Sequence, residues 1–94
     1  MDQITQGDVV AWSSQANGGT TRKVGQVVAV IPAGAAGAAR VRREVNERVT
    51  AGTHRSAFGG GSARGHESYL VEVVTGGPAA KKALYWPVVS RLER

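Results

Sequence analysis

The stretch GDVVAWSS, residues 7–14, combines a turn with a short strand that carries one of only five aromatic residues in the chain. Glycine and aspartate favour the turn, and the β-branched valines favour extended backbone after it. Because side chains alternate between the faces of a strand, Val10 and Trp12 share one face and Val9 and Ala11 the other. Both faces are apolar, so we expect the strand to be covered on each side. Trp12 is then a core or rim residue, and the wall of a ligand site is the alternative.

Three more segments have the composition of strands, each bounded by glycine-rich or proline-containing stretches. Together with residues 9–13 they are VGQVVAVI (24–31), YLVEVV (69–74) and ALYW (83–86). Two glycine-containing hairpin loops are expected between them, at residues 14–23 and 75–82. The final VVSRLER predicts one tight helical turn and a last short strand. Four or five short strands with such turns predict an all-β fold, a small closed or half-open barrel.

Residues 32–66 form a long insert between the second and third strands. Within AARVRREVNERV (38–49), three valines recur at the i, i+4 and i+8 spacing of one helix face: Val41, Val45 and Val49. Glu44 and Arg48 are spaced to pair along the same helix, and Gly52 is expected to end it. We therefore predict one short helix on loose glycine- and alanine-rich tethers, with partial disorder of the insert as the alternative.

The whole chain, residues 1–94, is expected to form a single domain, with the barrel built from residues 7–31 and 67–94. No apolar run approaches the roughly 18 residues that a membrane-spanning helix needs. The N-terminal residues do not resemble a secretory signal, and there are no cysteines. These features predict a cytoplasmic protein that does not bind membranes. A monomer and a homodimer are both compatible with the sequence.

Charge gives the first indication of a partner. Twelve lysines and arginines against seven acidic residues give a net charge of +5, which favours an anionic partner, most commonly nucleic acid. Arginine predominates in the insert, and its planar guanidinium binds phosphate through paired hydrogen bonds. A solvated helix face is the competing interpretation. The predicted phosphate-binding residues are Arg40, Arg42, Arg43, Arg48, Arg55 and Arg64 in the insert and Lys23, Lys81 and Lys82 at the loop ends.

The few aromatic rings limit recognition of a methylated lysine, which needs several rings around one cation. A small barrel uses two or three rings to fill its interior, so a complete aromatic cage is not expected. Tyr85 and Phe58 are instead the candidate stacking rings for a base beside the basic residues.

Signals of catalysis are weak. His54 and His66 are the only imidazoles, and as metal ligands they would need carboxylate help, for which only Glu67 is near in sequence. Ser56 is close to His54, but no orienting acid lies in that stretch. The glycine-rich GGGSARG (59–65) lacks the Lys-Ser/Thr ending of a phosphate-binding loop. We therefore expect no enzyme activity, no metal site and no cofactor.

Five motifs follow one another along the chain: GDVVAWSS, GQVVAV, THRSAF, HESYLVEV and LYWPVVSRL. Their order resembles that of small bacterial Tudor-like proteins of the hypervirulence-associated Tudor domain family. The resemblance touches most of the chain outside residues 32–52 and implies an SH3-like barrel of about five strands. The alanine- and arginine-rich helix departs from the family pattern. The resemblance implies no single function, because such barrels host peptide, methylated-residue, RNA and DNA binding.

The sequence thus predicts a non-enzymatic binding module that contacts DNA or RNA through its arginine-rich insert. The alternative is a protein–protein adaptor or inhibitor, in one version phage- or plasmid-borne, that docks on an acidic partner protein. In that case the three insert valines pack on the target, on a second copy of the chain or on the barrel itself.

Overall fold

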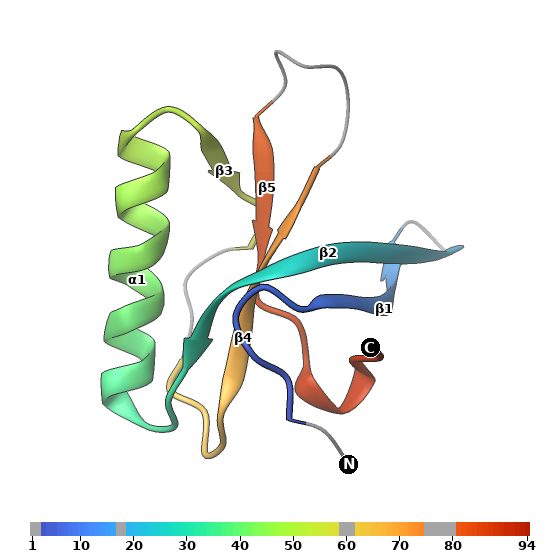
Figure 1. Ribbon diagram of the computed structural model, residues 1–94, viewed down its shortest axis with the longest axis horizontal. Helices are drawn as coiled ribbons and strands as arrows, with labels where there is room; N and C mark the ends of the chain where they lie inside the picture. Colours follow the sequence, from blue (N-terminus) through green and yellow to red (C-terminus); the bar gives the residue numbers. More distant parts are fainter. Residues whose placement is uncertain (1–2, 17–18, 59–61, 75–80) are drawn as a thin grey trace.

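A five-stranded mixed sheet with one helix against it forms the molecule, as the computed structural model shows for residues 3–16, 19–58, 62–74 and 81–94 (Figure 1). The strands lie in the order β1–β2–β4–β5–β3, and each pair is antiparallel except β3 and β5, which are parallel. The prediction of a mostly-β fold with a helix between the second and third strands is confirmed. The elements are β1 (Val9–Ala16), β2 (Gly19–Ile31), α1 (Ala35–Thr50), β3 (His54–Ser56), β4 (Ser68–Val73), β5 (Lys82–Tyr85) and the 3₁₀ helix η1 (Val89–Arg91).

The hairpin between β1 and β2 is longer than the sequence predicted. Residues 14–23 were expected to form a loop, but their backbones continue the antiparallel ladder as far as the pair Ala16–Gly19. Extended backbone suits the β-branched Thr20 and Thr21, and an Asn-Gly pair is a frequent two-residue connection between antiparallel strands. That connection, residues 17–18, lies outside the described part of the chain.

Helix α1 is likewise longer than the short helix predicted, at 16 residues. The stretch before Ala38 was interpreted as a loose tether, yet it is helical from Ala35, because alanine is the strongest helix former. Gly37 is buried where the helix passes so close to Pro32 that a Cβ there would collide with the proline carbonyl. Gly52 follows the helix with φ of 81°, as expected for the residue that ends it.

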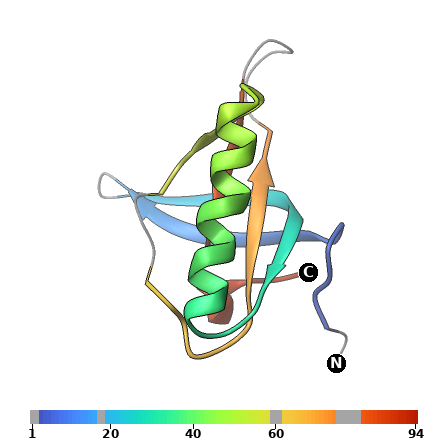
Figure 2. The same cartoon turned by 90° about the vertical axis from the view of Figure 1, so that its left-hand side faces the viewer.

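The insert also supplies a strand that the sequence did not predict. β3 directly follows α1 and pairs in register with β5, His54 with Lys82 and Ser56 with Leu84. Figure 2 shows α1 standing in front of the sheet, with β3 diverging from it as the chain leaves the helix. The insert therefore adds a strand to the sheet as well as a helix.

Two apolar clusters lie on opposite faces of the sheet. Tyr69, Val71 and Val73 face one cluster and Leu70 the other, which is the alternation expected for that strand. The first cluster contains Val10, Trp12, Val27, Tyr69, Val71 and Val73. The second, beneath the helix, contains Ala29, Ile31, Val41, Leu70 and Trp86.

Trp12 is 4% exposed, which confirms it as a core residue. The expectation that both faces of its strand are covered is wrong, since Val9 is 61% exposed. The helix explains the difference: it covers the part of that face around Ala29 and Leu70 and leaves the β1 part open.

Strand β2 contributes to both clusters and contains a β-bulge. Val27 pairs with Val71 and Ala29 with Leu70, so Val28 is an additional residue on the β2 side. Val28 and Ala29 therefore both pack toward the helix, and a bulge of this kind bends the strand that carries it.

The chain returns to β1 after β5. The predicted helical turn is η1, and beyond it Ala11 and Glu93 exchange two backbone hydrogen bonds, of 2.7 and 2.8 Å. In place of the predicted last short strand the structure has this single bridge, which occupies part of the outer edge of β1. Among the helices of the described chain, none combines the length and the apolar character needed to cross a membrane.

Candidate nucleic-acid interface

Four of the predicted basic residues lie on β5 or beside it. Lys81 and Lys82 stand at its start, and Arg55 on β3 is directly opposite its second residue, Ala83. Lys23 on β2 reaches its last residue, Tyr85. Because Arg55 pairs with Ala83 and side chains alternate along a strand, Arg55 lies on the same face of the sheet as Tyr85, whereas Lys82 lies on the opposite face with His54. We call Lys23, Arg55 and Lys81 the basic row.

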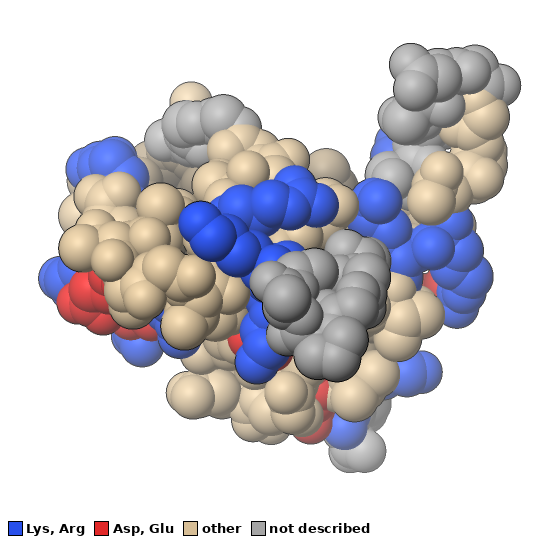
Figure 3. Space-filling model, turned by 90° about the horizontal axis from the view of Figure 1, so that it is seen from above, with Lys and Arg blue, Asp and Glu red and all other residues tan. Residues whose placement is uncertain are grey.

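Viewed from the end at which β3 and β5 begin, lysine and arginine side chains gather around these strands and beside the β1–β2 hairpin (Figure 3). Acidic side chains occupy only small areas of this view and lie mainly toward its margins. Arg55 and Lys81 are exposed, and neither forms an ion pair with any described residue. Their charges are therefore available to an anionic partner.

Tyr85 sits in the middle of a small aromatic and cationic cluster. The Nζ atom of Lys23 is 5.0 Å from the centre of the Tyr85 ring, and the Trp12 ring meets it edge-on at 5.7 Å with an interplanar angle of 65°. Lys23 is directly opposite Trp12 in the β1–β2 ladder, which places both side chains on one face of the sheet. The buried Trp12 thus holds a half-buried tyrosine ring in place beside an ammonium group.

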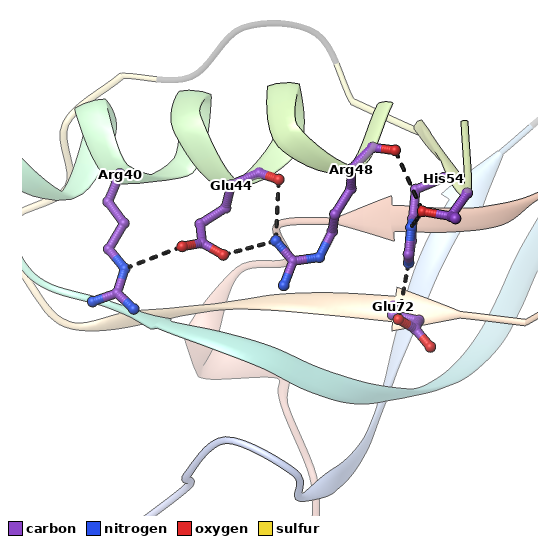
Figure 4. A network of polar contacts seen from close by, with 6 residues as sticks. Arg40, Glu44, Arg48, His54 and Glu72 are labelled. Atoms are coloured by element: carbon purple, nitrogen blue, oxygen red, sulfur yellow. Dashed lines mark hydrogen bonds and ion pairs between the residues drawn. The ribbon is translucent and has the colours of Figure 1, made fainter. Parts of the chain in front are cut away.

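Lys82, on the opposite face of the sheet, lies beside Glu72 of β4. Its Nζ is 3.4 Å from Oε1 of that carboxylate, while Oε2 is 3.0 Å from Nε2 of His54 (Figure 4). His54 is 8% exposed, and its Nδ1 lies 2.7 Å from the hydroxyl of Thr53. The histidine was expected to have a surface or hydrogen-bonding role, and the structure shows it buried and hydrogen-bonded.

This contact changes the pKa of Glu72. Burial alone would raise the pKa of its carboxyl, but the hydrogen bond to His54 and the positive charge of Lys82 outweigh burial and lower the pKa below its ordinary value. Sequence reasoning missed this residue and considered only Glu67 as a partner for the histidines. The available signal was a glutamate within the otherwise apolar strand YLVEVV.

Two of the helix arginines are paired along α1. Glu44 lies between them, with Oε1 2.7 Å from Nη1 of Arg48 and Oε2 3.7 Å from Nε of Arg40 (Figure 4). The Glu44–Arg48 pair is the one that the sequence predicted. Arg42 and Arg43 are exposed and form no ion pair within the described chain. The helix therefore presents two uncompensated arginines rather than a continuous basic face.

Arg64 is engaged with its own chain. Its guanidinium lies 3.9 Å from the centre of the Trp86 ring and donates hydrogen bonds of 2.8 Å to the carbonyls of Trp86 and Pro87. Burial lowers the pKa of this guanidinium. The other candidate stacking ring, Phe58, lies on the helix-covered side of the sheet, away from Tyr85. Its ring centre is 6.2 Å from that of Trp86. The predicted site residues are thus divided between the basic row, the exposed helix face and internal contacts.

The groups considered for catalysis do not come together in the described residues. Ser56 donates its hydroxyl to the carbonyl of Phe58, and His66 lines a separate hollow with Glu67 and Val88. The residues that the structure describes contain no group of three or more His, Cys, Asp or Glu that could hold a metal ion.

No protein-family model matches the chain, and comparisons with curated proteins and with solved structures find no significant match.

Proposed function

We propose that this protein is a non-enzymatic binding module that holds single-stranded nucleic acid along β5. The phosphates contact the basic row, and one base stacks near Tyr85. The observation that carries the proposal is the position of Lys23, 5.0 Å from the centre of a half-buried Tyr85 ring that also meets the buried Trp12 edge-on.

The arrangement of charge favours the β5 row over the helix. Arg40 and Arg48 share Glu44, and Arg64 is bound to backbone carbonyls, so three of the insert arginines already have partners. Arg55 and Lys81 have none among the described residues. Uncompensated cations placed close together attract a polyanion more strongly than the same charges dispersed over a surface.

The aromatic ring favours a single strand over a duplex. A base presents its π face to a protein ring only when it is unstacked, and such stacking beside cations binds single strands with little sequence preference. Tyr85 stands at the surface of a strand rather than at the tip of a helix or ribbon that could enter a groove, which is how duplexes are usually read.

We further propose that the fold belongs to the SH3-like, Tudor-like class that the motif order resembles. In support, β1, β2, β4 and β5 form a consecutive antiparallel run, η1 follows β5, and the bridge from Ala11 to Glu93 returns the chain to β1. Helix α1 and β3 are then an addition between the second and third strands of that pattern.

Fluorescence anisotropy with labelled 15-nucleotide oligo(dT), oligo(U) and a 15-base-pair duplex tests the binding proposal. We expect both single strands to bind more tightly than the duplex, with an affinity that falls with salt by a log–log slope of about 0.7 for each phosphate contacted. A triple variant, K23Q/R55Q/K81Q, should lose affinity and about two units of that slope.

The matched control is the double variant R42Q/R43Q, which removes exposed charge from the helix and leaves the row intact. It should retain most of the binding. Failure of all three probes to bind at about 50 mM salt, or an equal loss in the two variants, contradicts the proposal.

A further inference from the structure

A groove lies between helix α1 and strand β3, on the face of the sheet opposite Tyr85. It has a volume of about 180 Å³. We call it the α1–β3 groove, and its lining residues are Ala38, Val41, Arg42, Val45, Asn46, Ser56 and Phe58.

The floor of the groove is apolar and well supported. Val41 is 3% exposed and belongs to the cluster under the helix, and Val45 and Phe58 pack against that cluster. Phe58 is held in turn by the Trp86 ring. Sites that enclose a whole small-molecule ligand measure about 300–1,000 Å³, so this groove is suited to a single bulky side chain.

The rim of the groove is cationic and polar. Arg42 and Asn46 are exposed one helical turn apart on α1, and Ser56 of β3 lies across from them. No aspartate or glutamate is among the described residues that line it. Arg42 also lacks the carboxylate partner that Arg40 and Arg48 find in Glu44. The charge of the rim therefore matches an acidic group beside the apolar anchor.

The edge of the sheet borders the same groove. β3 is the last strand in the order β1–β2–β4–β5–β3, and in its described residues it is paired on one side only, with β5. Figure 1 shows the chain leaving the end of α1 and continuing through β3 toward β5. An unpaired edge of this kind offers backbone groups to an added peptide strand, while pockets select its alternate side chains.

We infer that the α1–β3 groove docks an extended acidic peptide segment of a partner protein. One bulky apolar side chain enters the floor formed by Val41, Val45 and Phe58, and a neighbouring carboxylate pairs with Arg42. The inference does not rest on the proposed nucleic-acid site, because Tyr85 and Lys23 lie on the other face of the sheet.

NMR titration of the ¹⁵N-labelled protein tests the inference. The probes are acetylated heptapeptides with Leu, Ile, Phe or Trp at the centre and three Asp or Glu residues around it. Two control peptides have serine at the centre, or Asn and Gln in place of every acid. We expect at least one of the four probes to shift the amide signals of Val41, Val45 and Phe58, and both controls to lose that effect.

The matched protein variants are R42E and R43E, which reverse neighbouring exposed charges on the same helix. R42E is expected to weaken the best peptide at least about tenfold, as for the loss of a charge-assisted contact. R43E should weaken it less than about threefold, because it changes only the general field. Dispersed spectra for both variants, as for the unmodified protein, show that neither result reflects unfolding.

Three outcomes overturn the inference. One is that no probe shifts the groove residues at millimolar peptide. Another is that R42E and R43E weaken binding equally, which indicates unspecific charge attraction. The last is that oligo(dT) shifts the groove residues and displaces the peptide, which assigns the groove to nucleic acid instead.

Discussion

His54 and Glu72 meet across an intervening strand: Nε2 of the first lies 3.0 Å from Oε2 of the second, although β5 separates β3 from β4 in the sheet. The contact passes over the part of β5 that carries Lys82 and Leu84 on the same face. It joins the strand that follows the helix to β4, in addition to the backbone pairing of β3 with β5.

The stability of the protein should therefore depend on acidity through Glu72. Its folded-state pKa lies below its ordinary value, so the carboxylate stabilises the fold at every pH above its unfolded-state pKa of about 4.3. That contribution disappears as the pH falls through the lower, folded-state pKa. Thermal unfolding followed by circular dichroism from pH 7 to 3 should show a smaller acid-induced fall in Tm for E72Q than for the unmodified protein.

The matched control for that measurement is E47Q, which changes an exposed helix glutamate that forms no ion pair with a described residue. It should leave the pH profile close to that of the unmodified protein. A profile for E72Q that is parallel to the unmodified one throughout the acidic range contradicts the assignment.

Replacement of Arg64 should destabilise the fold. The variant R64A loses a cation–π contact and two hydrogen bonds to backbone carbonyls, which together contribute roughly 1–3 kcal/mol. R43A, on the exposed side of the helix, should change the free energy of unfolding by less than about 0.5 kcal/mol. Urea denaturation measures both, and equal values for the two variants would show that the contact with Trp86 is unimportant.

Gly37 provides a case in which packing should oppose helix propensity. Alanine favours a helix by about 1 kcal/mol over glycine, but a methyl group at position 37 would collide with the carbonyl of Pro32. G37A is expected to lower the free energy of unfolding by about 1–3 kcal/mol, the range for overpacked sites. The exposed A36G should cost about 1 kcal/mol, from propensity alone. Stabilisation by G37A contradicts the close approach of the helix to Pro32.

Tyr85 should contribute to nucleic-acid binding through its ring rather than its hydroxyl. We expect Y85A to weaken oligo(dT) binding by about 1–3 kcal/mol, the range for a lost base–aromatic stack, and Y85F to bind nearly as well as the unmodified protein. Anisotropy titrations give the affinities, and circular dichroism checks that both variants remain folded. A large loss of oligo(dT) affinity in Y85F would show that the phenol oxygen, rather than the ring, makes the contact.

Local pattern was enough to predict much of the fold. The alternation in YLVEVV correctly assigned Tyr69, Val71 and Val73 to one face and Leu70 to the other, because a strand has a period of two. The valine spacing indicated the helix, and Gly52 marked its end. Each of these features depends on neighbours within a few positions in the chain.

Contacts between distant segments could not be predicted in the same way. β3 is a three-residue strand of His, Arg and Ser with no apolar pattern, and only its pairing with β5 makes it a strand. Arg64 was taken as a candidate phosphate ligand because its contact with Trp86, 22 residues away, leaves no mark in the local sequence. Charge alone identified the basic residues but not which of them have partners within the fold.

The bridge between Ala11 and Glu93 also bears on how the chain is made. The outer edge of β1 can pair with Glu93 only after residue 93 has left the ribosomal exit tunnel. In the same way, β3 can pair only after β5 has been synthesised. During synthesis the early hairpin and helix must therefore remain with unpaired edges and an uncovered apolar face. Contacts this distant in sequence close slowly, so this small domain is expected to reach its final form after translation of residue 93, in a late and cooperative step.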